Sequence, residues 1–206
     1  MATSRNTVGQ KLATGKARVR PEHDFYATPE KDIERMLRYV FSETVNANDQ
    51  CLHVLDPCAG NGAFKRAILN VMPKWTVTQW DIIQRREELD WVGDFLQVDP
   101  TNMQTSIVVM NPPFGLSVEF IQHALKFLKP GGVLIAFLKL DFLASKKRYN
   151  SLFKDNNQLA QVIVNVSRVN CKYDGDGNDK ASSTTDSGWF IFQNGMPMTP
   201  VIRWME

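Results

Sequence analysis

Residues 52–62 read Leu-His-Val-Leu-Asp-Pro-Cys-Ala-Gly-Asn-Gly, and the predicted fold class depends most on this segment. It begins with a short apolar run, passes through two glycines and leads into residues 63–71, which have helical character. The stretch therefore predicts a strand, a glycine-rich turn and a helix in succession. In open α/β sheets such turns lie at the carboxyl ends of strands, where ligands bind.

Further apolar runs alternate with helical patterns along the rest of the chain. The expected additional strands are residues 75–80, 106–110, 133–138, 162–166 and 189–193. The expected additional helices are residues 29–41, 118–128 and 151–159, and a long polar surface loop is expected over residues 172–187. This alternation predicts an α/β fold with a doubly wound, mostly parallel sheet that helices cover on both faces.

The composition is that of one globular domain. The chain has 206 residues, of which 43% are hydrophobic and 22% are charged. The longest apolar run, residues 133–138, is far shorter than the roughly 20 residues that span a bilayer, so we expect a soluble protein. The three cysteines lack paired spacing and the three histidines lack partners in any motif, so neither a disulfide framework nor a metal site is expected.

The positive charge is concentrated at the N-terminus. Residues 1–20 contain five basic residues and no acidic one, whereas the net charge of the whole chain is only +2. This pattern predicts a flexible basic tail over residues 1–20, followed by a single domain over residues 21–206. Arg18 and Arg20 are candidates for phosphate contacts, and an ordinary solvated terminus is the alternative.

The segment from Asp56 to Gly62 carries the first chemical signal. It is not a Gly-x-Gly-x-x-Gly motif, and no Gly-Lys-Ser/Thr follows it, so a dinucleotide or triphosphate site is disfavoured. An acidic residue at a strand end suits a ligand with a cationic amine and no phosphate there. S-adenosylmethionine fits that description, and a tight structural turn is the alternative.

The second signal is Asn111-Pro112-Pro113-Phe114, which follows another expected strand. Two prolines stiffen the turn, so the Asn111 amide oxygen and the Pro112 carbonyl can both accept from one amino group. Two acceptors on an aromatic amine would localise its lone pair toward an incoming methyl group. Phe114 can stack on a flat base that has left its helix. A bare Pro-Pro turn is the alternative.

Together these two segments resemble the class I S-adenosylmethionine-dependent methyltransferases, most closely the small, phage-type adenine-N6 DNA methyltransferases. The resemblance extends over residues 25–192. It implies a Rossmann-like sheet of seven strands with an antiparallel last strand. It also implies S-adenosylmethionine as cofactor and methyl transfer to the N6 amine of adenine in DNA. The expected location is the cytoplasm of a bacterium or of a phage-infected host cell.

The resemblance also implies a set of site residues. The implied catalytic residues are Asn111, Pro112, Pro113 and Phe114. The implied cofactor-binding residues are Phe25, Tyr26, Thr28, Asp56, Cys58, Ala59, Gly60, Gly62, Asp81, Asp94 and Phe95. Within that set, the resemblance implies that the segment 25–29 closes over the methionine moiety and that Asp81 holds the ribose hydroxyls. Asp94 accepts from the cofactor's adenine amino group, and Phe95 lines the adenine ring.

No segment is long enough to form a separate target-recognition domain. Recognition of DNA would then depend on short pieces such as the basic tail and the run Lys146, Lys147 and Arg148, although a charge run at a helix start is usually a solvated face. A partner protein that supplies recognition surface is an open alternative. The alternatives are an RNA adenine-N6 or guanine-N2 methyltransferase, an enzyme that methylates a glutamine amide, and a non-catalytic nucleic-acid-binding subunit.

Overall fold

The computed structural model describes residues 26–42, 51–85, 89–155, 158–171, 185–195, 197 and 199–206. The predicted basic tail, with Arg18 and Arg20, lies outside the described residues, and so does Phe25. Most of the predicted loop 172–187 also lies outside them.

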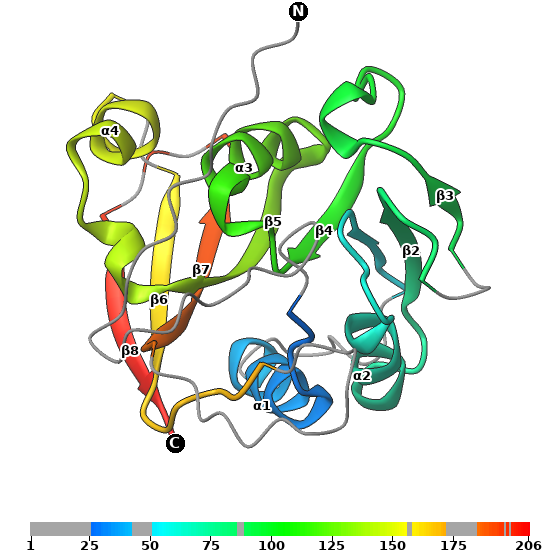
Figure 1. Ribbon diagram of the computed structural model, residues 1–206, viewed down its shortest axis with the longest axis horizontal. Coiled ribbons are helices and arrows are strands. Elements are labelled where there is room, and N and C mark those ends of the chain that lie inside the picture. Colours follow the sequence, from blue (N-terminus) through cyan, green and yellow to red (C-terminus); the bar gives the residue numbers. More distant parts are fainter. Residues whose placement is uncertain are drawn as a thin grey trace, which may run out of the picture.

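The elements alternate along the chain, as Figure 1 shows. The helices are α1 (Glu30–Phe41), α2 (Ala63–Val71), α3 (Ser117–Lys126) and α4 (Lys146–Arg148). The strands are β1 (His53–Asp56), β2 (Thr76–Asp81), β3 (Trp91–Val92), β4 (Thr105–Met110), β5 (Leu128–Lys139), β6 (Leu159–Asn165), β7 (Ser187–Gln193) and β8 (Val201–Met205). Short helical turns are η2 (Phe95–Gln97), η3 (Phe114–Leu116), η4 (Leu140–Leu143) and η5 (Tyr149–Phe153).

One sheet runs through the described part of the chain, with the strand order β3-β2-β1-β4-β5-β7-β6-β8. The strands from β3 to β5 are parallel to their neighbours, and β7 is antiparallel to both β5 and β6. The predicted α/β class is therefore confirmed, including the mostly parallel sheet and the antiparallel strand near the C-terminus.

The sheet differs from the prediction in its strand count and in several boundaries. It has eight strands rather than seven. Two of them lie outside the expected ranges: the two-residue β3, which pairs with β2, and β8, which lies parallel to β6 beyond the antiparallel β7. β8 has four exposed residues out of five, so it carries no burial pattern that a sequence could reveal. β5 begins at Leu128, before the Pro-Gly-Gly turn expected to precede it. The helix predicted over residues 151–159 is wrong, since η5 ends at Phe153 and Leu159 already belongs to β6.

Helices cover the sheet from two sides. The apolar faces of α1 and α2 pack together and onto one face of the sheet, where Ile33, Leu37 and Ile68 are fully buried. α3 packs on the other face through Phe120 and Ile121. Figure 1 shows α1 and α2 together in the lower part of the view and α3 and α4 in the upper part. This sandwich holds the strand ends rigidly, which is what a ligand site at the sheet edge requires.

The strands β1, β2 and β4 are parallel neighbours, so their last residues, Asp56, Asp81 and Met110, lie at the same edge of the sheet. The two predicted motifs follow β1 and β4, and the fold therefore brings them together. In the described part of the chain, no helix is long and apolar enough to cross a membrane.

Candidate functional site

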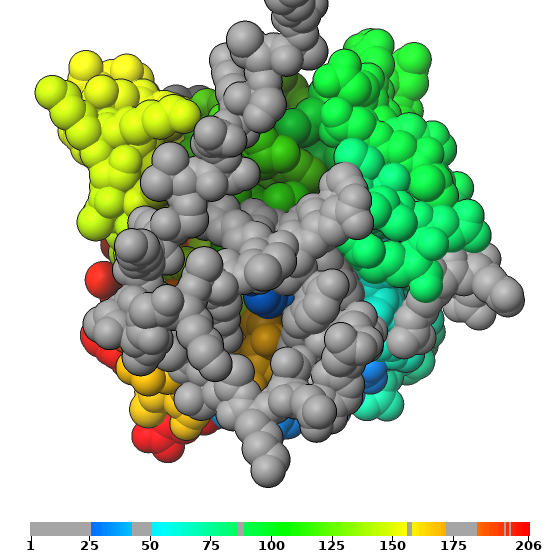
Figure 2. Space-filling model, in the orientation of Figure 1, coloured from blue at the N-terminus to red at the C-terminus, as the bar shows by residue number. Residues whose placement is uncertain are grey.

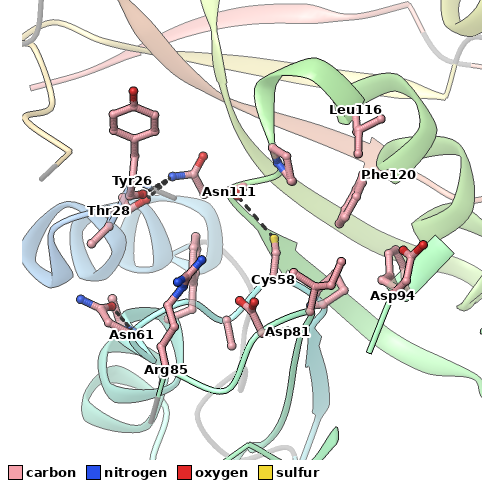
Figure 3. Close-up of a pocket in the computed structure, with 18 of the residues that line it drawn as sticks. Tyr26, Thr28, Cys58, Asn61, Asp81, Arg85, Asp94, Asn111, Leu116 and Phe120 are labelled. Atoms are coloured by element: carbon pink, nitrogen blue, oxygen red, sulfur yellow. Dashed lines mark hydrogen bonds between the residues drawn. The ribbon is translucent and has the colours of Figure 1, made fainter. Parts of the chain in front are cut away.

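A cavity of about 410 Å³ opens at this edge of the sheet. Its wall includes the predicted residues Tyr26, Thr28, Cys58, Ala59, Asp81, Asp94, Phe95, Asn111 and Pro113. The other predicted residues that the structure describes, Asp56, Gly60, Gly62, Pro112 and Phe114, belong to the same segments but do not line the cavity. Residues from the N-terminal segment, the β1 loop, the β2 end, the β3 loop and the β4 turn therefore share one site (Figure 3).

The loop after β1 takes its shape from its glycines. Gly60 has φ 56° and Gly62 has φ 78°, the left-handed region that side-chain-bearing residues rarely adopt. The Gly60 backbone N–H donates to Asp81 Oδ2 at 2.7 Å, which ties the loop to the end of β2. A Cβ added at Gly62 would lie only 3.1 Å from the Arg66 guanidinium. The loop is thus closely fitted to its surroundings, and its residues Cys58, Ala59 and Asn61 border the cavity.

Asp81 is held in place from two sides. Besides accepting from Gly60, it accepts from the Ile83 backbone N–H at 3.0 Å through Oδ1. The residue is only 7% exposed, yet it lines the cavity. Each carboxylate oxygen has more than one lone pair, so the pinned carboxylate can still accept from hydroxyl groups of a ligand.

Asp56 lies buried behind the β1 loop. Its exposure is 0%, and its Oδ1 accepts a long hydrogen bond of 3.4 Å from the Cys58 backbone N–H. Its Oδ2 has no hydrogen-bond partner among the described residues. Burial, together with the neighbouring charge of Asp81, raises the pKa of Asp56 well above its usual value. A buried acceptor without a donor is costly, and a cation held in the adjoining cavity would favour the charged form of Asp56.

Asn111 is oriented by the N-terminal segment. Its side-chain Nδ2 donates to the Tyr26 carbonyl oxygen at 2.8 Å and to Thr28 Oγ1 at 3.1 Å. Figure 3 shows the Asn111 nitrogen directed toward these two residues. The reverse orientation would place Oδ1 against the Tyr26 carbonyl, so the amide orientation is settled by its partners. Oδ1 is therefore the Asn111 atom left to accept from a ligand.

A thiol connects the two motifs. Cys58 Sγ donates to the Asn111 carbonyl oxygen at 3.4 Å, between the β1 loop and the β4 turn (Figure 3). Burial raises the pKa of Cys58 well above its usual value, and the charges of Asp56 and Asp81 raise it further. The thiol is therefore kept neutral, and it serves as a packing and hydrogen-bonding group rather than a nucleophile.

Phe114 lies at the margin of the cavity rather than in its wall. Its neighbours Pro113 and Gly115 both line the cavity. The Phe114 ring centroid is 5.5 Å from the Tyr26 ring, with 35° between the ring planes. The Lys139 ammonium lies 4.6 Å from the same centroid. The Asn111 end of the cavity is thus bordered by two aromatic rings and one cation.

The opposite end of the cavity is aromatic and apolar. Asp94 Oδ1 accepts from the Leu96 backbone N–H at 3.0 Å and so begins the turn η2. Phe95 is almost fully buried and packs against Phe120 at 5.4 Å and His123 at 4.8 Å between ring centroids. This end suits a flat apolar ring that offers an amino group to Asp94.

Sequence reasoning missed several residues that line the cavity: Asn61, Ile82, Arg85, Leu116 and Phe120. Ile82 follows Asp81 directly, so its position after a strand-end acid is a usable signal. Arg85 reaches into the cavity between Asn61 and Asp81, as Figure 3 shows. No local pattern marks Arg85, because the loop after β2 has no glycine motif.

The predicted basic run splits into two kinds of residue. Lys146 and Lys147 are exposed on α4, which projects at the upper left of the face in Figure 2. Arg148 instead donates to the carbonyl oxygens of Phe142, Asp141 and Ala144 at 2.6, 2.7 and 2.9 Å. Its guanidinium fastens η4 to α4, so a phosphate would have to compete with these carbonyls. Among the described residues, no group of His, Cys, Asp or Glu could hold a metal ion.

No protein-family model matches the chain, and no curated protein matches it. Solved structures do match. One is a Listeria monocytogenes protein described as a class I S-adenosylmethionine-dependent methyltransferase, with TM-score 0.63, 15% identity, and coverage of 93% of this chain and 68% of that one. The chain has the class I methyltransferase fold.

Two further structures support this fold. The type I restriction-modification methyltransferase subunit from Streptococcus thermophilus matches with TM-score 0.66 and 14% identity over 86% of this chain and 47% of that one. The N-methyltransferase NodS from Bradyrhizobium japonicum, in complex with S-adenosyl-L-homocysteine, matches with TM-score 0.50 and 16% identity over 81% and 87%. The chain thus spans about half the length of the restriction-modification subunit.

Proposed function

We propose that this protein transfers the methyl group of S-adenosylmethionine to the exocyclic N6 amine of adenine in DNA. The observation that carries the proposal is the orientation of Asn111, whose Nδ2 is bound by the Tyr26 carbonyl and Thr28 Oγ1. Its Oδ1 is consequently an acceptor at the end of a cavity that also contains a strand-end acid, Asp81.

The residues fit S-adenosylmethionine. Asp81 provides a fixed carboxylate for the ribose hydroxyls. Asp56 lies behind Cys58 of the cavity wall, so it would attract the cationic amine of the methionine moiety through its charge, without direct contact. Asp94 and Phe95 provide an acceptor and an apolar wall for the adenine ring. When bound, the cofactor supplies an electrophilic methyl group on a sulfonium. The Listeria and Bradyrhizobium structures, with their named cofactor and cofactor product, favour the same choice.

The β4 turn prepares the acceptor amine. Asn111 Oδ1 and the Pro112 carbonyl accept from the two hydrogens of an aromatic amine, which favours its pyramidal form and localises its lone pair. Pro112 and Pro113 lack N–H groups, so no competing donor points at the amine from these positions. No histidine lines the cavity in the described part of the chain. The amine can lose its proton to solvent after transfer, so no general base is required.

DNA is favoured as the acceptor by two observations. The segment Phe25-Tyr26-Ala27-Thr28-Pro29 resembles the opening of adenine-N6 DNA methyltransferases, and its described part binds Asn111. The Streptococcus protein is a methyltransferase subunit of a restriction-modification system.

That protein is about twice as long as the matched region, so we propose that target recognition here uses short surface segments, among them Lys146 and Lys147, or a partner protein. The basic tail with Arg18 and Arg20 would add phosphate contacts. RNA is the second candidate acceptor.

The test is methyl transfer from labelled S-adenosylmethionine to genomic DNA, total RNA and protein extract in parallel. Asn111→Ala is the inactive variant, and Asn70→Ala is a matched control, because Asn70 is exposed and binds Glu34 away from the cavity. We expect N6-methyladenine in the DNA digest, at least about 100-fold less with Asn111→Ala, and no change with Asn70→Ala. Label confined to RNA or protein, or no label despite bound cofactor, would refute the proposal.

A further inference from the structure

Lys139 is the last residue of β5 and lies beside the Asn111 end of the cavity. β4 and β5 are parallel, and Met110 at the end of β4 pairs with Ala136 of β5. β5 continues past the end of β4 and carries Lys139 alongside the turn that starts at Asn111. The Lys139 ammonium accordingly lies 4.6 Å from the centroid of the Phe114 ring.

The Lys139 ammonium has no carboxylate partner in the described part of the chain, and the residue is half-buried. Asp141 follows two residues later but does not pair with it. Asp186 is tied to the same turn, since its carbonyl accepts from the Leu140 N–H at 3.1 Å, but its carboxylate binds Arg168 at 3.0 Å. The ring face of Phe114 attracts the ammonium but does not neutralise its charge, as a carboxylate would. The positive charge therefore remains available to an anion from outside.

The surroundings indicate which anion this is. Asn111 and the rings of Tyr26 and Phe114 border a space suited to a flat base with an amino group. In a nucleic acid, a base is joined through its sugar to a phosphate on each side, so a base at Asn111 brings phosphates to the cavity margin. We propose that Lys139 binds a backbone phosphate next to the target nucleotide. This inference rests on the proposed function and deepens it.

Such a contact selects the class of acceptor. A phosphate bound by Lys139 favours nucleic acid over a free nucleoside or a protein amide, since neither of these carries the anion. The contact forms when the substrate binds and is kept during transfer, so its loss should raise KM for DNA more than it lowers kcat. One phosphate contact also contributes about 0.9 to the slope of log affinity against log salt for duplex DNA, and about 0.7 for a single strand.

The test is the salt dependence of DNA binding, measured by fluorescence anisotropy with a labelled oligonucleotide duplex and the full chain. Lys139→Gln removes the charge and Lys139→Arg keeps it. Lys126→Gln is the matched control, because Lys126 is exposed to solvent at the end of α3. It lies close to the start of β5, whereas Lys139 lies at the end of β5 beside the cavity. Calorimetry with S-adenosylmethionine reports whether each variant retains a folded cofactor site.

We expect Lys139→Gln to lower the salt slope by about 0.9, while Lys139→Arg and Lys126→Gln keep the wild-type slope. Weaker binding with an unchanged slope would assign Lys139 to packing against Phe114 and overturn the inference. A slope that falls equally in the Lys126 variant would overturn it as well. The proposed function fails separately: a wild-type protein that binds DNA with a Lys139-dependent slope but methylates no adenine would refute the reaction and leave the phosphate contact.

Discussion

The side-chain nitrogen of Asn111 lies 2.8 Å from the carbonyl oxygen of Tyr26, a residue 85 positions earlier in the chain. A second contact, 3.1 Å to Thr28 Oγ1, uses the other amide hydrogen. The N-terminal segment therefore lines the cavity and also orients Asn111, the residue that we propose binds the acceptor amine. The two halves of the proposed reaction share this segment, so its substitution should affect the rate of transfer.

Thr28→Val should lower kcat by roughly 10-fold or more. The substitution removes the hydroxyl that binds Asn111 Nδ2, so the amide can rotate and Oδ1 is no longer fixed toward the acceptor amine. Thr28→Ser keeps the hydroxyl and should retain most of the activity. Steady-state kinetics with saturating cofactor checks this. A loss restricted to cofactor affinity, with kcat unchanged, would place Thr28 in cofactor binding alone.

Asp81→Ala should weaken S-adenosylmethionine binding by roughly 10- to 100-fold. The carboxylate both faces the cavity and holds the Gly60 and Ile83 N–H groups, and a hydrogen bond to a charged group contributes about 1.5–3 kcal/mol. Calorimetric titration measures the change. Asp99→Ala is the control, since Asp99 is exposed and, among the described residues, accepts from Thr101 alone. Equal affinities for wild type and Asp81→Ala would remove Asp81 from the site.

Asp56→Asn should stabilise the protein and impair its cofactor binding. Because burial raises the pKa of Asp56, the folded state disfavours the charge at neutral pH, and this cost grows as the pH rises above the unfolded value of about 3.9. The neutral amide avoids the cost, so the melting temperature without cofactor should rise by a few degrees at about pH 8. The gain should shrink as the pH falls toward about 4 and vanish below about pH 3, where Asp56 is protonated in both states.

Thermal unfolding with and without S-adenosylmethionine separates the two effects. The cofactor should raise the melting temperature of the wild type more than that of Asp56→Asn, because ligand affinity adds to stability. Asp99→Asn is again the surface control. A variant that is destabilised at every pH, or one that binds the cofactor as tightly as the wild type, would contradict a role for Asp56 as the buried partner of a cation.

Short motifs after β1 and β4 are the part of the site that can be predicted from the sequence. Gly60 and Gly62 follow a strand and precede a helix, and the Asn111 turn follows another, so both motifs had to lie at one sheet edge once the sheet was parallel. The hydrogen bonds from Asn111 to Tyr26 and Thr28 depend on how α1 packs beside the sheet, and no spacing rule encodes that contact. The sequence therefore predicts that the β1 loop and the Asn111 turn lie at the same edge of the sheet. It does not predict how the Asn111 side chain is oriented by Tyr26 and Thr28.

The errors have equally specific causes. β8 was not predicted because its exposed Ile202 and Trp204 leave no alternation of buried and exposed positions. Arg148 was grouped with Lys146 and Lys147 because charge runs give no information on partners, whereas the fold supplies three carbonyl oxygens to its guanidinium. Burial patterns and turn chemistry are local signals. The pairing of β8 with β6 and the partners of Arg148 depend instead on packing between segments that no local pattern reveals.

His123 should make stability depend on pH. Its ring packs against Phe95 and Phe127 at 4.8 and 5.3 Å, and its Nε2 lies 3.0 Å from the Val98 carbonyl oxygen. Burial lowers the pKa of His123, and the positive charge of Lys126 adds to this, whereas the hydrogen bond to Val98 opposes it. The folded state therefore favours the neutral ring, which can still donate from Nε2.

The sign of the effect follows from the lowered pKa. As the pH falls, His123 of the unfolded chain is protonated first, near the ordinary histidine pKa of about 6.5. The stabilising contribution of the neutral, packed ring is therefore complete above that pH, and it is lost as the pH falls through the pKa of His123 in the folded state. His123→Gln can still donate to Val98 but does not titrate. Its melting temperature should therefore fall less than that of the wild type between about pH 7.5 and about pH 5.5. The pKa of His53 is also lowered by burial, so His53 should contribute equally to the pH dependence of stability in the wild type and in His123→Gln. Identical pH profiles for wild type and His123→Gln would show that the ring beside Phe95 does not titrate in this range.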